Sequence, residues 1–133
     1  MIVIATAQLA DLLDVGSIQG YLQTCSYLLF QNNLTPVPGT LLAGFTQSTF
    51  AGYTAGGIAT PTWTAPVIVG AAGVVTSAIV TWTGTGAAQN IYGYYVVDIA
   101  GNLVFSERYA GAPFSISTGI SFFVSPYFSA ITQ

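Results

Sequence analysis

The stretch NIYGYYVVDIAGNLVFSERYA, residues 90–110, decides the fold. Two runs rich in tyrosine, valine and phenylalanine, which are residues favoured in β-strands, flank the five residues DIAGN at 98–102. Aspartate, glycine and asparagine supply the backbone geometry that a tight connection needs. The sequence therefore predicts an antiparallel β-hairpin over about residues 90–110.

Further short strands are predicted on both sides of this hairpin. Within 73–83, two alternating sets of residues differ in polarity, as in a half-buried strand. Turn-forming Gly, Pro and Asn residues separate the β-leaning runs, which are 22–31, 58–64, 66–70, 73–83, 114–118 and 120–128. Seven to nine short strands with closely spaced turns indicate a mainly β fold, either a Greek-key sandwich or a barrel.

One short helix is expected near the N-terminus, over about residues 6–16. Leu9, Leu12 and Leu13 repeat at helical spacing, Asp11 and Asp14 fall on the other side, and glycines at 16 and 20 are typical helix stops. The segment 41–57 reads as a loop in which Thr46 or Ser48 could cap a single helical turn. A chain of 133 residues with no internal repeat or composition shift predicts a single domain, residues 1–133.

Charge is nearly absent from this chain. Charged residues make up 4% of it, whereas roughly 25% is typical of soluble domains. Ser, Thr, Asn and Gln must supply the polar surface, and such neutral groups cost less to bury than ions. Because the cores of subunit interfaces are depleted in charge, this composition favours extensive contacts between subunits. A neutral, Thr/Ser-rich secreted β-domain is the alternative.

The composition also excludes several functions as expectations. With no His and no Lys, few groups remain for acid–base catalysis, so we expect no enzyme. No Cys/His motif or acidic cluster predicts a metal, and no cofactor motif is present. One arginine against four acids disfavours nucleic acid. Every apolar run is interrupted well short of the roughly 20 residues of a membrane-spanning helix.

The candidate functional residues lie mostly in the hairpin. Glu107 and Arg108 are adjacent in a strand, so their side chains point to opposite faces: Glu107 with Phe105 and Tyr109, and Arg108 with Val104 and Ser106. A carboxylate among aromatic rings needs a partner, which could be a backbone donor, a tyrosine hydroxyl or an arginine of another subunit. We expect Glu107, Arg108, Tyr92 and Tyr94 to be structural anchors or interface contacts.

The other aromatic residues leave two interpretations open. Trp63 and Trp82 are either core and interface anchors or stacking platforms of a carbohydrate-binding module. Cys25, the one cysteine, lies in an apolar run and is expected to be a small buried hydrophobic residue.

Five segments occur in an order that resembles a family. They are YLLFQNNLTP (27–36), TQSTFAGYT (46–54), TWT (62–64), NIYGYYVVD (90–98) and SERYAGAP (106–113). Together they resemble small proteins encoded in the structural-gene regions of tailed bacteriophages, although this chain has fewer charges and a more aromatic last strand, FFVSPYF (122–128).

The resemblance implies a virion structural protein assembled in the host cytoplasm. The leading expectation is a capsid cement, or decoration, protein on the outer surface of the phage head. Its partners would then be copies of itself, with a trimer favoured, and the major capsid protein. A tail-fibre or adhesin module that binds host glycans, and a self-assembling tail-tube or filament subunit, are the alternatives.

Overall fold

The computed structural model describes residues 2–4, 18–59, 61–65, 67–69 and 72–131. The expected helix over 6–16 lies outside these residues, as do Asp11 and Asp14. The helix that is described, α2, spans Ile18–Leu22. It contains Gly20, so the prediction that this glycine ends a helix is wrong.

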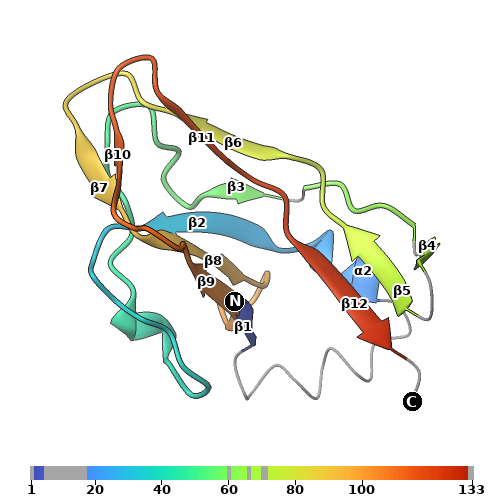
Figure 1. Cartoon of the computed structure of the whole chain (residues 1–133). Coiled ribbons are helices and arrows are strands. Elements are labelled where there is room, and N and C mark those ends of the chain that lie inside the picture. The colour runs from blue at the N-terminus through green and yellow to red at the C-terminus, as the bar shows by residue number, and fades with distance from the viewer. Residues whose placement is uncertain (1, 5–17, 60, 66, 70–71, 132–133) are drawn as a thin grey trace.

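The predicted hairpin is confirmed and forms the centre of a five-stranded antiparallel sheet (Figure 1). Its two strands are β8 and β9, and Asp98–Asn102 connect them. The strand β2 pairs with β8 on one side, and β1 pairs with β9 on the other. In spatial order the strands are β1 (Ile2–Ile4), β9 (Leu103–Arg108), β8 (Gly93–Val97), β2 (Ser26–Phe30) and β3 (Ile58–Ala59).

The remaining strands form a long ribbon that continues the same hairpin. Three pairs of short strands follow one another, with β4 added at the far side of β5. Their register changes by only one residue at each break, as the opposed pairs Ile91–Phe114, Thr81–Phe123 and Thr76–Tyr127 show. The pairs are β7 (Gln89–Ile91) with β10 (Phe114–Ile116), β6 (Val80–Thr83) with β11 (Ser121–Val124), and β5 (Ala72–Thr76) with β12 (Tyr127–Ile131), and β4 is Val67–Val69.

Residues 72–131 are therefore one hairpin folded over on itself. At the fold, the Tyr109 amide donates to the Tyr92 carbonyl and carries the pairing from ribbon to sheet. The centres of the Phe128 ring on β12 and the Phe105 ring on β9 lie 5.0 Å apart, so the ribbon packs against the sheet here. We call the ribbon and β4 the outer layer.

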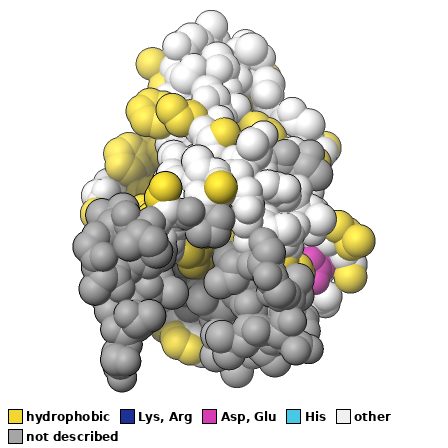
Figure 2. Space-filling view, turned by 90° about the vertical axis from the view of Figure 1, so that its right-hand side faces the viewer, with side chains coloured by type: hydrophobic (Ala, Val, Ile, Leu, Met, Phe, Trp, Pro, Cys, Tyr) yellow, Lys and Arg dark blue, Asp and Glu magenta, His cyan; other side chains and the backbone are white. Residues whose placement is uncertain are grey.

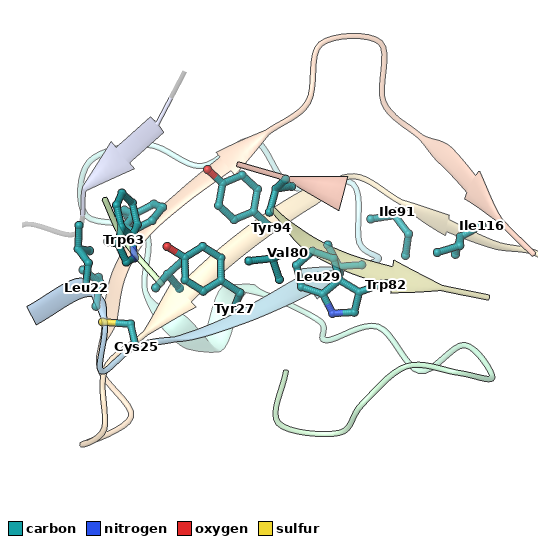
Figure 3. Packing of buried hydrophobic residues seen from close by; sticks show 14 of the residues in the cluster. Leu22, Cys25, Tyr27, Leu29, Trp63, Val80, Trp82, Ile91, Tyr94 and Ile116 are labelled. Carbon is teal, nitrogen blue, oxygen red and sulfur yellow. The ribbon is translucent and has the colours of Figure 1, made fainter. Parts of the chain in front are cut away.

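The main core lies between the outer layer and the five-stranded sheet. Tyr27 and Leu29 of β2 and Tyr94 of β8 meet Val80 and Trp82 of β6 in this cluster (Figure 3). A second cluster lies on the opposite face of the sheet and contains Leu28, Phe30, Phe45, Tyr95 and Leu103. Because β2 and β8 are buried on both faces, they are continuously apolar rather than alternating.

The fold class is confirmed as mainly β with antiparallel sheets and one short described helix. A barrel is not formed, since the described strands make separate sheets that do not close. The strands are also shorter and more numerous than expected, because β1 was not foreseen and three predicted strands divide. The divided segments are 73–83, 90–97 and 120–128.

Each division has a visible cause. In 73–83, Val75 and Ser77 are buried before the break, whereas Val80 and Trp82 are buried after it, so the inward face changes phase. Pro126 separates β11 from β12. Tyr92 separates β7 from β8 at the place where the chain leaves the ribbon for the sheet.

The helical turn predicted at Thr46 or Ser48 is wrong. A single 3-10 turn lies earlier, over Leu42–Gly44. The segment after it is extended along β2, since the Ser48 amide donates to the Leu29 carbonyl and the Gln31 amide donates to the Thr46 carbonyl. This pairing occupies the Ser48 amide and the Thr46 carbonyl, which therefore cannot take part in a helix.

Candidate interaction surface

The sheet places Tyr94 directly opposite Glu107 on the neighbouring strand. The Tyr94 hydroxyl donates to Glu107 Oε2 over 3.0 Å. Glu107 shares its face with Phe105 and Tyr109 as predicted, and a tyrosine hydroxyl is one of the partners anticipated for it. This hydrogen bond links β8 to β9 within the chain.

Three tyrosine rings lie in a row beside this carboxylate. Tyr94 stacks on Tyr27 with ring centres 6.2 Å apart and on Tyr109 with ring centres 5.9 Å apart. Burial, followed by the nearby charge of Glu107, raises the pKa of the Tyr94 hydroxyl far above its ordinary value. Tyr94 therefore stays neutral and remains a hydrogen-bond donor at any physiological pH.

Tyr92 and Arg108 form a second pair on the opposite face. The Arg108 guanidinium lies 5.0 Å from the centre of the Tyr92 ring, and its Nη1 donates to the Leu34 carbonyl over 3.0 Å. Arg108 therefore links β9 to the 34–45 segment, which packs in the second core cluster through Leu34, Leu42 and Phe45.

One predicted neighbour of Arg108 is misplaced. A bulge sets Val96 opposite Phe105 and Val97 opposite Leu103, which leaves Val104 as the extra residue. Val104 then packs with Phe105 in the main core instead of sharing the face of Arg108.

Asp98 organises the tip of the hairpin. Its Oδ1 accepts hydrogen bonds from the amides of Ala100 and Asn102, and its Oδ2 accepts from the Asn102 side chain and the Tyr21 hydroxyl. Burial is the largest single influence and raises the pKa of this carboxyl, but the four hydrogen bonds together outweigh it and hold the pKa below its usual value. The carboxylate therefore fixes the turn and joins it to α2.

Both tryptophans and the cysteine lie in the core. Trp63 and Trp82 are each 2% exposed, so neither ring can stack on a sugar in this conformation. Cys25 is fully buried as predicted. Burial, followed by the charge of Asp98, raises the pKa of its thiol to about 11, which leaves it unreactive at neutral pH.

Most of the exposed large apolar residues lie on the outer layer, where they were not foreseen, although Val37, Leu41 and Ile99 are exposed elsewhere. Phe123 is 66% exposed and Tyr127 is 62% exposed, although both belong to strands. Ile79, which precedes β6, and Val67, on β4, are also largely exposed. The composition of 120–128 signalled a sticky aromatic segment, but its alternation did not show which rings would face outward.

Side chains with hydroxyl groups are also exposed on the outer layer. Thr81 and Thr83 of β6 and Ser121 of β11 are exposed, and the Thr83 and Ser121 hydroxyls lie 2.8 Å apart. No charged residue occurs between residues 61 and 97 or between 109 and 131. Figure 2 shows the described part of one side of the molecule as hydrophobic and uncharged groups, with acidic colour at one place and no basic colour.

The described residues offer no group of three or more His, Cys, Asp or Glu side chains that could hold a metal ion. Within the same residues, no helix is long and apolar enough to cross a membrane. The most distinctive surface in the described part of the chain is thus the uncharged outer layer.

Comparison with known proteins finds no matching family model, no similar curated protein and no similar solved structure.

Proposed function

We propose that this chain is a virion structural protein that acts as a capsid cement, or decoration, protein on the outside of a tailed-phage head. Its role is structural rather than catalytic. Its partners are copies of itself and the major capsid protein, and it binds neither nucleic acid nor a membrane.

The observation that carries this proposal is the uncharged outer layer. Free monomers rely on surface charge for solubility, yet this layer exposes Phe123, Tyr127 and Ile79 among neutral hydroxyls. Such a surface loses little solvation when a partner covers it. Such a surface is expected of a protein that functions in an assembled lattice, where neighbouring subunits cover it.

The charged residues of the described part support the same proposal. Asp98 and Glu107 accept hydrogen bonds within the hairpin, and Arg108 donates to the Leu34 carbonyl elsewhere in the chain. They are occupied by internal partners, which suits a rigid building block better than a binding pocket. Five motifs resemble those of tailed-phage structural proteins, which supports a role in the phage particle. They lie at 27–36, 46–54, 62–64, 90–98 and 106–113.

The mechanism is passive. Each contact removes apolar and hydroxyl surface from water, and a symmetric shell repeats that contact many times. Because the protein binds the assembled shell and not its separated subunits, it stabilises the shell by mass action.

A co-sedimentation experiment tests this function. Purified chain is added to phage heads prepared without it, and bound protein and the temperature of DNA release are measured. We expect saturable binding and a higher release temperature. Heads that neither bind the chain nor gain heat resistance would contradict the proposal, and regular tubes of the purified chain in electron micrographs would favour a tube or filament subunit.

A further inference from the structure

Among the described strands, β11 and β12 form an edge of the outer layer. These strands pair with β6 and β5 on one side only, and no described residue pairs with their other side. The edge runs over residues 121–131, and Figure 1 shows it as the red margin of the ribbon.

The hydrogen-bond pattern shows which backbone groups are unpaired at this edge. The Gly84 amide donates to the Ile120 carbonyl, and the Ser77 amide donates to the Pro126 carbonyl. In an antiparallel pair, residues alternate between bonding to the neighbour and pointing away from it. Counting from these two bonds, Ser121, Phe123 and Tyr127 direct their amides and carbonyls outward.

Pro126 does not close this edge. Its carbonyl bonds inward to Ser77, so the N–H that proline lacks would also have pointed inward. Proteins block exposed edges with charges, especially lysine, or with prolines at outward positions. Residues 120–131 contain no charged residue, and Phe123 and Tyr127 are mostly exposed. Neither a charge nor an outward proline in residues 120–131 therefore prevents another strand from pairing with this edge.

The occupant that fits this edge is the same edge of a second copy. Two identical strands that run antiparallel about a twofold axis bring each outward donor opposite an acceptor. The chain has a net charge of −3, but the described charges, Asp98, Glu107 and Arg108, all lie in the β8–β9 hairpin and its connection. Two copies can therefore meet along 121–131 without burying or opposing any of these three described charges.

We propose that two copies of this chain pair antiparallel through residues 121–131, which joins their outer layers into one continuous sheet with Phe123 and Tyr127 at the seam. This inference deepens the self-association part of the proposed function and rests on it. A twofold contact closes at two copies, so it replaces the trimer that the family resemblance favours.

Amide hydrogen exchange by NMR, combined with light scattering, tests this pairing. We expect twice the chain mass of 13.8 kDa at high concentration. The Phe123 and Tyr127 amides should be protected in that state and exchange at least about tenfold faster on dilution, whereas the inward Phe122 and Val124 amides should stay protected at both concentrations.

Three lysine variants separate the edge from the face of the layer. Phe123→Lys and Tyr127→Lys place a charge at the seam and should yield the mass of one chain. Thr81→Lys is the matched control, because Thr81 is exposed directly opposite Phe123 but lies one strand away from the edge. It should leave the dimer intact, and the dispersion of the amide spectrum verifies folding in each variant.

Three results would overturn the pairing: a monomer at every concentration with rapid exchange at Phe123 and Tyr127, a trimer, or dissociation by Thr81→Lys as complete as that by Phe123→Lys. A monomer that still binds phage heads would remove the pairing and leave the proposed function standing. A dimer that binds no heads would do the reverse.

Discussion

At the scale of single residues, the close packing around Gly93 explains why the motif IYGYY contains a glycine. A Cβ at this position would overlap the Glu107 carbonyl oxygen and the Phe30 ring. The absence of a side chain lets β9 and the second core cluster approach β8 closely. The flanking residues Tyr92 and Tyr94 can then reach Arg108 and Glu107 on opposite faces.

Gly93→Ala should lower the free energy of unfolding by about 1–3 kcal/mol, because backbone and ring must shift to admit the methyl group. Gly44→Ala is the control, since the nearest atoms to its Cβ are at ordinary van der Waals distance, 3.7 Å and beyond. It should change stability by less than about 0.5 kcal/mol. Urea unfolding of both variants measures this, and equal effects would refute the packing argument.

Tyr94→Phe should cost about 1–2 kcal/mol of stability, because Glu107 loses the hydroxyl that donates to it inside the protein. Tyr127→Phe also removes a tyrosine hydroxyl, but from a side chain that is 62% exposed, so it should change the free energy of unfolding little. The two variants are compared by the midpoint of urea unfolding. A Tyr94→Phe variant as stable as the wild type would mean that this bond contributes nothing.

At the scale of elements, the Asp98 turn makes stability depend on pH. The folded pKa of Asp98 lies below its unfolded value of about 3.9. Its contribution is therefore complete above the unfolded pKa and is lost as the pH falls through the folded pKa.

In urea unfolding from about pH 7 to about pH 2, wild type should exceed Asp98→Asn in stability at neutral pH, and the gap should close in acid. The amide variant keeps the shape of the side chain but has no charge to lose. A gap that stays constant over the whole pH range would show that the charge of Asp98 is unimportant to the turn.

The elements also show what sequence patterns reveal and where they stop. The hairpin was predictable because its turn residues, 98–102, are local and chemically distinct. The break at Ala78 and Ile79 was not, since each half alternates correctly and only packing across the layers changes the inward face. The extra residue Val104 likewise depends on register with β8, which a single strand does not encode.

For the candidate site residues too, some features could be predicted from the sequence and others could not. The opposite faces of Glu107 and Arg108 follow from strand geometry alone, and both side chains lie as predicted. Their partners, Tyr94 and Leu34, depend on cross-strand register and on a loop, and the sequence left several choices open. The composition showed that the chain has few charges, but it did not show where in the fold the uncharged outer layer would lie, because the residues of that layer are far apart in sequence.

At the scale of the whole molecule, the folded hairpin distributes roles between its halves. The half that contains β8 and β9 carries the described charges and uses them internally. The half that forms the outer layer has no charge and carries most of the exposed large apolar residues, although Ile99 in the β8–β9 connection is exposed too. An assembled particle accounts for this division, since one half maintains the fold and the other meets neighbours.

The burial of the tryptophans leads to a prediction about the glycan-binding alternative. Trp63→Ala and Trp82→Ala should each lose about 3–5 kcal/mol of stability, since both remove a large core side chain. Val37→Ala, at a side chain that is 57% exposed and lies outside the outer layer, should lose under about 0.5 kcal/mol. Thermal unfolding followed by circular dichroism measures both. Folded tryptophan variants of normal stability that lose sugar binding would support the adhesin alternative instead.

The most direct measurement of the central claim is an electron cryo-microscopy map of the native phage particle. The account predicts density for this chain on the outer surface of the head, with Phe123, Tyr127 and the rest of the outer layer covered by neighbouring subunits. A particle that lacks the chain, or one in which that layer faces solvent throughout, would contradict it.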